Sequence, residues 1–105
     1  MKNITLINQE TSIRKALELI NKKKFKILFI INKLKRLKGS LTDGDIRRYL
    51  IKNSNISGSV KLAMKKNPYF VTEKNFNENK MQKILISKNL IQIPVVNRNK
   101  QVINV

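Results

Sequence analysis

A short segment near the middle of the chain, SLTDGDIRRYL (residues 40–50), brings together side chains that could do chemistry. It holds two of the six acidic residues, Asp43 and Asp45, in a chain whose formal net charge is +17. Thr42 and Asp45 are three residues apart, which is the spacing of a capping box at the first turn of a helix. The same helix start would offer free backbone N–H groups to a phosphate, and Thr42 would add a hydroxyl donor. The spacing alone leaves both interpretations open.

The other polar groups of this segment are also compatible with a ligand that carries a ribose and a phosphate. Asp45, one turn into the helix, can accept two hydrogen bonds from a ribose diol. Gly44 has no Cβ, so a ligand could approach the first turn closely. Arg47 and Arg48 could pair with phosphates in a bidentate geometry that lysine does not match. In the alternative without a ligand, Asp45 only favours the positive end of the helix dipole.

Catalytic chemistry is not predicted for these residues. Asp43 and Asp45 are two positions apart at a helix start, so they point in different directions and make a poor acid–base couple. Ser40 and Thr42 have no base to activate them, because the chain contains no histidine, and it contains no cysteine either. The other four carboxylates lie at predicted helix starts or on an exposed helix face: Glu10, Glu18, Glu73 and Glu78. We expect no catalytic residue and no metal site in this chain.

The strong positive charge does not by itself predict an anionic partner. Lysine supplies 18 of the 23 basic residues, and Lys, Asn and Ile together make 47 of the 105 residues, which is the bias that an AT-rich genome imposes on a surface. The lysines are scattered, arginine is scarce, and no aromatic residues are interleaved with a basic stripe. We interpret the charge as surface composition, and nucleic acid is a less favoured partner.

Length and composition indicate one cytoplasmic domain. The chain is long enough for a single core, and hydrophobic residues make up 41% of it. Its longest aliphatic and aromatic run, Ile27–Ile31, is far too short to cross a bilayer, and residues 1–10 contain no signal-peptide core. No membrane association is expected.

An internal repeat organises the chain. When the sequence is shifted by 65 residues, the apolar positions superimpose without a gap. The matched pairs are Leu6/Val71, Ala16/Met81, Leu19/Ile84, Ile20/Leu85, Phe25/Leu90, Leu28/Ile93, Ile30/Val95, Ile31/Val96 and Leu37/Val102. Because the match continues through helical and strand patterns, we predict two copies of one supersecondary unit that pack sheet against sheet about a pseudo-twofold axis.

Each copy has the pattern of a strand, a helix and two further strands. In the first copy we predict strands at 4–7, 27–31 and 37–41 and helices at 11–23 and 43–52, the last burying Ile46, Leu50 and Ile51. In the second copy we predict strands at 69–72, 92–96 and 101–105 and a helix from about 77. A strand–helix–strand unit implies a parallel crossover, and the following pair of strands implies an antiparallel hairpin. The sequence ends where the second copy should begin its last helix.

This doubled unit resembles a tandem cystathionine β-synthase (CBS) domain pair, also called a Bateman module. The resemblance lies in GSLTDGDIRR (39–48), IPVVN (93–97) and MKKNPYFVT (64–72) and covers essentially the whole chain. The first stretch matches the ligand signature G-hydrophobic-x-[ST]-x-x-[DN], with Thr42 and Asp45 at its polar positions. The resemblance implies an α/β fold, with residues 1–58 as the first CBS repeat and 59–105 as an incomplete second repeat, together forming one module.

The resemblance also implies a function and a set of site residues. CBS pairs of this kind are regulatory modules that bind an adenine nucleotide (AMP, ADP or ATP), require no cofactor and form homodimers. The implied ligand residues are Thr42, Gly44, Asp45 and Arg48, with Phe25 and Ile27 in the segment that flanks the base. TDGDIRR is similar to CBS pairs of sugar-phosphate enzymes. A pair that begins at Met1 favours the N-terminal part of a sugar nucleotidyltransferase, whose catalytic domain would follow this chain.

Departures from the family pattern keep two alternatives open. Ser40 stands at the signature's hydrophobic position, Phe29 replaces the usual proline of the first middle strand, and the second repeat has no [ST]-x-x-[DN]. The alternatives are a dimerisation module without a ligand and, less favoured, a basic nucleic-acid-binding domain.

Overall fold

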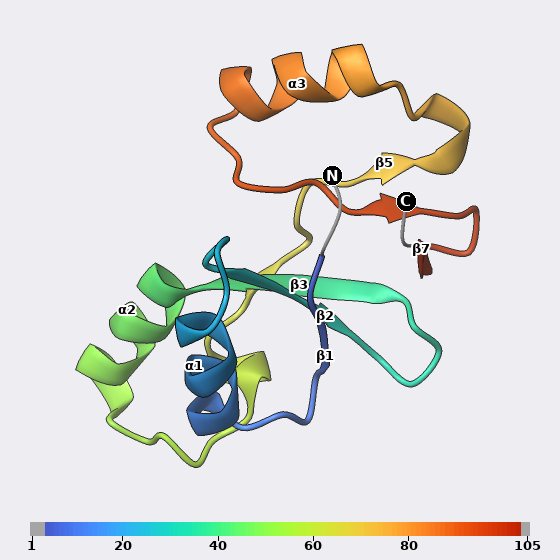
Figure 1. The fold of residues 1–105 in the computed structure, drawn as a ribbon. Coiled ribbons are helices and arrows are strands. Elements are labelled where there is room, and N and C mark those ends of the chain that lie inside the picture. Colours follow the sequence, from blue (N-terminus) through green and yellow to red (C-terminus); the bar gives the residue numbers. More distant parts are fainter. Residues whose placement is uncertain (1–3, 104–105) are drawn as a thin grey trace.

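The first half of the molecule is a four-stranded sheet with two helices on one face (Figure 1). The computed structural model describes residues 4–103. Strands β1 (Leu6–Asn8), β2 (Ile27–Ile31), β3 (Leu37–Thr42) and β4 (Lys65–Lys66) lie in the order β1-β2-β3-β4. Strands β1 and β2 are parallel and joined through helix α1 (Ile13–Asn21), whereas β2 and β3 form an antiparallel hairpin. Helix α2 (Asp43–Asn53) follows β3 without a break.

The second half repeats this plan with shorter strands. Strands β5 (Val71–Thr72), β6 (Val95–Val96) and β7 (Val102–Ile103) form a sheet in that order, with a parallel and then an antiparallel pair. Helix α3 (Glu78–Ser87) connects β5 to β6. Two 3-10 turns, η1 (Val60–Leu62) and η2 (Glu73–Asn75), lie in the connections. The predicted parallel crossovers and antiparallel hairpins are confirmed in both copies.

The helices begin where the sequence provides caps. The Ser12 hydroxyl accepts a hydrogen bond from the Lys15 backbone N–H at 3.1 Å, and α1 then buries Ile13, Ala16 and Ile20. These positions recur at intervals of three and four residues, which places them on one helical face. In α3 the cap is the Asn77 side chain, which lies 65 residues after Ser12.

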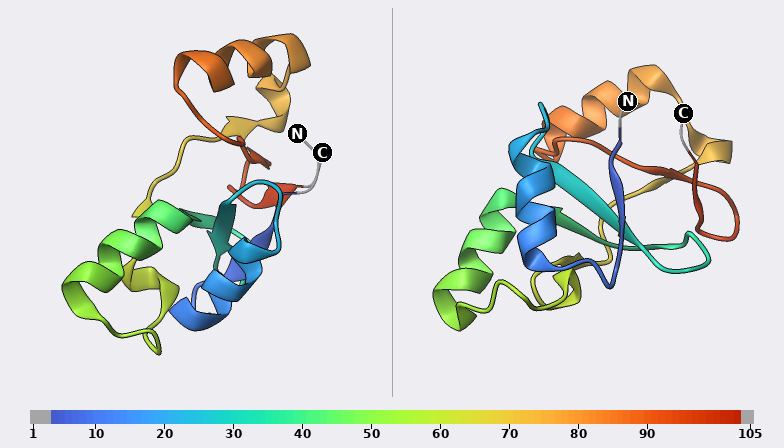
Figure 2. Two further views of the ribbon diagram at one scale, coloured as in Figure 1. Left: turned by 60° about the vertical axis from the view of Figure 1, so that its left-hand side comes forward. Right: turned by 60° about the horizontal axis from the view of Figure 1, so that its bottom comes forward.

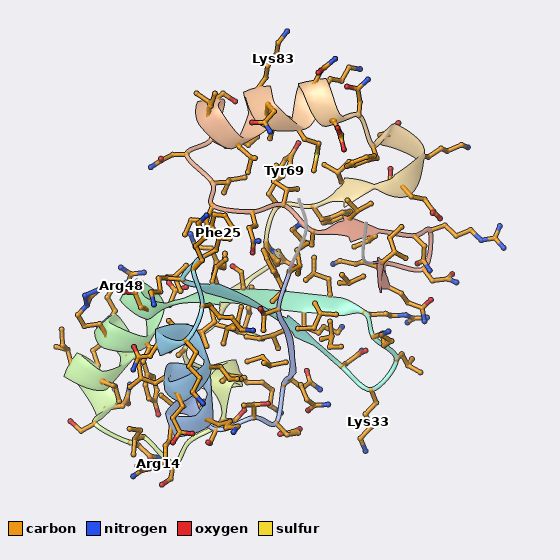
Figure 3. The ribbon with its side chains drawn as sticks, in the orientation of Figure 1. Arg14, Phe25, Lys33, Arg48, Tyr69 and Lys83 are labelled. Atoms are coloured by element: carbon orange, nitrogen blue, oxygen red, sulfur yellow. The ribbon has the colours of Figure 1, made fainter. Side chains whose placement is uncertain are left out.

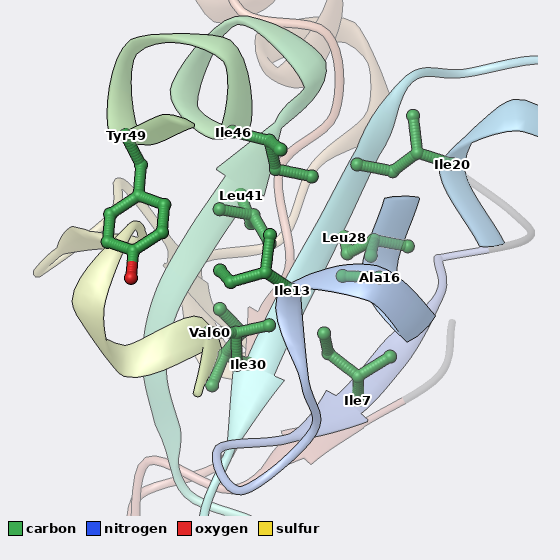
Figure 4. Close-up of a cluster of buried hydrophobic side chains, with 10 residues drawn as sticks. All are labelled: Ile7, Ile13, Ala16, Ile20, Leu28, Ile30, Leu41, Ile46, Tyr49 and Val60. Atoms are coloured by element: carbon green, nitrogen blue, oxygen red, sulfur yellow. The ribbon is translucent and has the colours of Figure 1, made fainter. Parts of the chain in front are cut away.

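The first repeat holds the largest core (Figure 4). Ten buried residues fill the space between the sheet and its two helices: Ile7, Ile13, Ala16, Ile20, Leu28, Ile30, Leu41, Ile46, Tyr49 and Val60. Helix α2 contributes Ile46 and Tyr49, whereas Ile51 is 78% exposed, so the predicted burial of Ile51 is wrong. Tyr49 lies three residues after Ile46 and therefore on the same face, whereas Ile51 lies five residues after it and faces away.

The two sheets face each other, and the helices lie on the outer sides (Figure 2). The Leu37 N–H donates to the Lys100 carbonyl at 2.9 Å, and the Val102 N–H donates to the Lys35 carbonyl at 3.1 Å. These two bonds exchange when the chain is shifted by 65 residues, so they mark the pseudo-twofold axis. A shared cluster of buried side chains also joins the repeats: Ile27, Phe29, Leu37, Val96 and Val102.

Several strands differ from the sequence prediction. The strand predicted at 4–7 lies at Leu6–Asn8, and the strand predicted at 69–72 pairs only at Val71–Thr72. Strand β4 was not predicted, and it pairs with β3 next to Gly39, where a Cβ would lie 2.6 Å from Met64 Sδ. The strand predicted at 92–96 pairs only at its last two residues, because Pro94 has no N–H to donate. The strand predicted at 101–105 pairs at Val102–Ile103, and its last two residues lie outside the described part.

The first core also extends past the predicted boundary between the repeats. Val60 is fully buried in the first cluster, and its N–H donates to the Thr11 carbonyl at 2.8 Å. The division into residues 1–58 and 59–105 stays a prediction. Among the described residues, no helix has the length and apolar character that crossing a bilayer requires.

Candidate functional site

The start of α2 has the predicted capping geometry. The Asp45 N–H donates to Thr42 Oγ1 at 3.1 Å, and the Thr42 N–H donates to Asp45 Oδ2 at 2.9 Å. Because Thr42 Oγ1 accepts from the backbone, its O–H is available to donate to another group. The capping interpretation is therefore satisfied in full, and the hydroxyl is still able to serve a ligand.

Asp45 also forms an ion pair on its second oxygen. Arg48 Nη2 lies 2.6 Å from Asp45 Oδ1, and only 11% of the Asp45 side chain is exposed, against 70% for Arg48. Both carboxylate oxygens are thus engaged, one by the helix cap and one by an arginine. A diol that hydrogen-bonds Asp45 must either share Oδ1 with Arg48 or displace the guanidinium. Arg47 instead faces Asp43, at 3.7 Å, on the exposed surface of the helix.

A cavity of about 200 Å³ lies between this helix start and the second repeat. The first repeat contributes Ile27, Phe29, Ser40, Thr42, Asp45 and Arg48 to its wall, and the facing side comes from the connector and the segment after α3. Of the described residues that line it, Asp45 is the only acidic one, and Arg48 and Lys65 are basic. The cavity therefore combines an apolar side, a helix start and a net positive charge.

The structure brings together four of the six residues predicted to bind a ligand. Ile27, Thr42, Asp45 and Arg48 line the cavity, whereas Gly44 and Phe25 do not. A Cβ on Gly44 would meet Arg48 Nη1 at 3.5 Å, which is an ordinary contact. Phe25 is 43% exposed and borders a separate hollow with Thr5 and three lysines, Lys22, Lys23 and Lys24.

The sequence analysis missed the second repeat's share of this wall. Tyr69, Leu90, Ile91 and Gln92 line the same cavity as Ile27. Lys88 Nζ lies 5.0 Å from the centre of the Tyr69 ring, which places a further cation beside the cavity. Figure 3 shows Tyr69 between helix α3 and the sheet of the first repeat. The 65-residue repeat contains a signal for part of this wall. It superimposes Leu90–Gln92 on residues 25–27, the segment of the first copy that was expected to flank the base.

In residues 4–103, no group of three or more His, Cys, Asp or Glu side chains has an arrangement that could hold a metal ion. The donors and acceptors of the cavity are suited to hydrogen-bonding a polar organic ligand.

Comparison with known proteins identifies the fold. Residues 1–52 match the family model described as CBS domain. The chain aligns with the crystal structure of CBSX2 in complex with AMP at a TM-score of 0.81 and 25% identity, covering 97% of this chain and 79% of that one. It aligns with the CBS domain pair of protein MJ0100, solved with 5′-methylthioadenosine and S-adenosyl-L-methionine, at a TM-score of 0.78 and 21% identity, covering 99% and 81%. The chain therefore has the mixed α/β fold of a CBS-domain pair, as the sequence predicted.

The chain is also similar to part of a longer protein. The protein RP505 of Rickettsia prowazekii (strain Madrid E) is 28% identical over 96 residues, which are 91% of this chain. The aligned part is 30% of the length of that protein, so this chain spans less than a third of its relative.

Proposed function

From the CBS-domain fold and the cavity beside Asp45, we propose that this chain is a regulatory module that binds an adenine nucleotide between its two repeats. One observation carries the proposal: Ile27, Thr42 and Asp45 of the first repeat line the same cavity as residues 90–92 of the second. CBSX2, which shares the fold at 25% identity, is described in complex with AMP. No catalytic role is assigned to this chain.

Each wall of the cavity has a role in this proposal. Ile27 and Leu90 offer apolar surfaces for the base, and Asp45 accepts hydrogen bonds from the ribose diol. The Thr42 hydroxyl donates to the phosphate, and the positive end of the α2 dipole favours the phosphate's negative charge. Arg48 adds a charge-assisted bond once it leaves Asp45. Gly44 and Phe25 remain in the proposal as neighbours of the cavity. Gly44 lies in the first turn of α2, and Phe25 precedes Ile27, which contacts the base.

Regulation follows from the position of the cavity. A nucleotide that touches both repeats stabilises the arrangement in which the two walls have the correct spacing. It therefore shifts the population of the module toward that arrangement, by an amount set by its differential affinity. A domain attached to either repeat would sense this shift. We extend the proposal to the N-terminal part of a sugar nucleotidyltransferase, on the basis of the TDGDIRR stretch. A coding sequence that contains no Gly-rich nucleotidyltransferase signature beside this module would overturn the extension.

A calorimetric titration tests the ligand. AMP, ADP and ATP are titrated into the wild type, Asp45→Ala and Asp43→Ala, with thermal melts in parallel. Asp43 is the matched control, because it lies in the same first turn but outside the cavity wall. We expect Asp45→Ala to lower affinity roughly 10- to 150-fold, the equivalent of a lost charged hydrogen bond of about 1.5–3 kcal/mol, and Asp43→Ala to leave it unchanged.

The melts separate the cap from the ligand site. Loss of the Asp45 cap should cost about 0.5–2 kcal/mol of stability without any ligand. A nucleotide concentration that saturates the wild type should raise the melting temperature of the wild type and of Asp43→Ala equally, and that of Asp45→Ala by much less. Absence of binding to the wild type below millimolar concentration would overturn the proposal and leave the capping role.

A second candidate function is dimerisation without a ligand, and exposed apolar side chains on the helical surface favour it. Ile51 on α2 is 78% exposed, Ile86 on α3 is 80% exposed and Leu62 in η1 is 63% exposed. Such residues are usual at the centre of an interface between subunits. We propose a homodimer that covers them. Light scattering at tens of micromolar should give twice the chain mass of 12.2 kDa, and a monomer mass would contradict it.

A further inference from the structure

The turns of the two β-hairpins lie on the same side of the molecule (Figure 1 and Figure 2). The first turn joins β2 to β3, and the second joins β6 to β7. Gln101 Nε2 donates to the Leu34 carbonyl at 2.9 Å, and Arg36 and Gln101 form an isolated antiparallel bridge. The two turns therefore form one continuous surface, which we call the turn surface (residues 32–38 and 97–101).

The turn surface concentrates positive charge. It contains six basic residues and no acidic one: Lys33, Lys35, Arg36, Lys38, Arg98 and Lys100. All are exposed except Lys100, which is half-buried with its Nζ 5.5 Å from the centre of the Phe70 ring. Within residues 4–103, none of the six forms an ion pair. Glu73 borders the surface, in a hollow that it shares with Lys74 and Arg98. Unpaired cations at this density attract an anionic partner.

An apolar side chain stands among these cations. Leu34 is 57% exposed, and its backbone is held on both sides. Its N–H donates to Asn32 Oδ1 at 2.9 Å, and its carbonyl accepts the bond from Gln101. Because the turn is already ordered, placing this leucine in an interface costs little conformational entropy. An apolar residue at the centre of a charged rim is the usual arrangement of a protein–protein interface.

The leucine distinguishes between classes of anionic partner. The phosphates of a nucleic acid would pair with the lysines and arginines but would offer Leu34 no apolar contact. A lipid surface binds proteins through a broad apolar face, and a single leucine does not provide one. An acidic protein surface can supply both carboxylates for the cations and an apolar pocket for the leucine.

We propose that the turn surface is a docking site for an acidic protein surface that carries an apolar pocket for Leu34. The basic side chains steer the partner, and Leu34 provides the central contact. The site is separate from the nucleotide cavity, because Ile27 and Thr42 lie at the other ends of β2 and β3. Docking therefore goes beyond the proposed nucleotide binding and is testable without it.

The test uses two short fluorescent peptides of glutamate, one with a central pair of leucines and one with alanines in their place. Mixed-sequence duplex DNA and vesicles of phosphatidylglycerol are the competing probes. All four are titrated at one physiological ionic strength. Leu34→Asn removes the apolar side chain and introduces the residue that the second turn carries at the equivalent position, Asn99.

Two triple variants test the charge. One is Lys33→Gln, Lys35→Gln and Lys38→Gln, and the matched control is Lys22→Gln, Lys23→Gln and Lys24→Gln. Both remove three exposed lysines, but the control lysines precede β2 and Lys33 follows it. Figure 3 shows Lys33 extending into solvent, well apart from Phe25, the residue after the control run. The five residues of β2 span roughly 17 Å at about 3.3 Å per residue, about twice the Debye length of ~8 Å at physiological salt.

We expect the wild type to bind the leucine peptide about fivefold more tightly than the alanine peptide, and more tightly than DNA or vesicles. Leu34→Asn should remove that preference and leave the alanine peptide unchanged. The turn-surface triple variant should weaken both peptides about tenfold, and the control by less than about twofold. Thermal melts of every variant should stay close to that of the wild type, because the substituted side chains are exposed.

Each other outcome overturns the docking site. Equal losses from the two triple variants would show an effect of overall charge. Equal binding of the two peptides, or an unchanged preference in Leu34→Asn, would leave the leucine without a role. Tighter binding of DNA or of vesicles would assign the surface to phosphates. Failure of the wild type to bind the leucine peptide below millimolar concentration would also contradict the proposal.

Discussion

The two repeats have the same local structure but unequal interiors. Asn32 and Asn97, which are 65 residues apart, each accept two backbone hydrogen bonds through Oδ1 and close the same turn. Lys35 and Lys100 each adopt a φ of 63° in that turn. The first repeat nevertheless buries ten residues in its own cluster, whereas the second buries four: Val71, Met81, Ile93 and Val95. Matching turns and caps therefore do not ensure matching cores.

The difference arises from the elements that follow the repeated part. Helix α2 supplies Ile46 and Tyr49 to the first core, and η1, just past the predicted boundary of the first repeat, supplies Val60. The hairpin of the second repeat is also shorter. Among the described residues, β6 and β7 pair over two positions, whereas β2 and β3 pair over five. The second repeat therefore depends on the shared cluster with the first for much of its burial.

The same asymmetry appears at the candidate site. The polar groups suited to ribose and phosphate, Thr42, Asp45 and Arg48, all come from the first repeat. The second repeat supplies mainly an opposing surface, through Tyr69 and residues 90–92. A ligand would therefore be held by one repeat and enclosed by the other, which makes its affinity sensitive to how the two are placed.

The largest expected effect compares two equivalent core positions. Leu28 and Ile93 are 65 residues apart, and both have 0% exposure. We expect Leu28→Ala to lower the free energy of unfolding by about 4–5 kcal/mol and Ile93→Ala by about 2–3 kcal/mol, both within the range for such changes. The larger cluster around Leu28 can relax less into the space left behind. Guanidinium denaturation of the three proteins gives these values.

An exposed position provides the control for this pair. Leu34 is 57% exposed, so Leu34→Ala should change stability by no more than about 0.5 kcal/mol. Both core variants should unfold in one transition, because the cluster of Phe29, Leu37 and Val102 couples the repeats. Equal costs for Leu28→Ala and Ile93→Ala would show that the unequal burial has no energetic consequence.

Local structure was largely predictable from the sequence, because its causes are local. The caps at Ser12, Thr42 and Asn77 locate the starts of all three helices to within about two residues. The 65-residue repeat predicts the parallel and antiparallel pairing of both copies, and the structure confirms it. Strand β4 was not predictable in this way, because its pairing with β3 is set by how the connector crosses the sheet.

Only the first repeat's side of the candidate site was predictable from the sequence, because only that side carries a recognisable motif. Thr42 and Asp45 were found from their spacing at a helix start, whereas Tyr69 and Gln92 reach the cavity through the packing of one repeat on the other. The Asp45–Arg48 ion pair has the i,i+3 spacing that a helix permits, but the spacing does not show whether Arg48 turns toward Asp45. Tertiary placement decides these features.

The second comparison concerns the equivalent caps of α1 and α3. Ser12 Oγ accepts from the Lys15 N–H and Asn77 Oδ1 accepts from the Lys80 N–H, both at 3.1 Å. Ser12→Ala and Asn77→Ala should each lower stability by about 1 kcal/mol, and thermal or chemical denaturation measures the loss. The exchanges Ser12→Asn and Asn77→Ser are the controls, because both residues are good caps and should stay within about 0.5 kcal/mol of the wild type. A negligible loss at Asn77 alone would mean that α3 is frayed at its start.

The smallest effect is expected at the two equivalent turn lysines. Lys35 and Lys100 have the left-handed φ of 63°, which costs a residue with a Cβ about 1–2 kcal/mol relative to glycine. Glycine loses about 0.5–1 kcal/mol through its greater freedom in the unfolded chain, so Lys35→Gly should stabilise the protein by about 0.5 kcal/mol. Lys100→Gly should gain less, because Lys100 Nζ lies 5.5 Å from the Phe70 ring centre and that contact would be lost. Denaturation midpoints of both variants, with Lys35→Ala and Lys100→Ala as controls that keep the Cβ, measure the difference. A larger gain at position 100 than at position 35 would contradict a stabilising role for the lysine–phenylalanine contact.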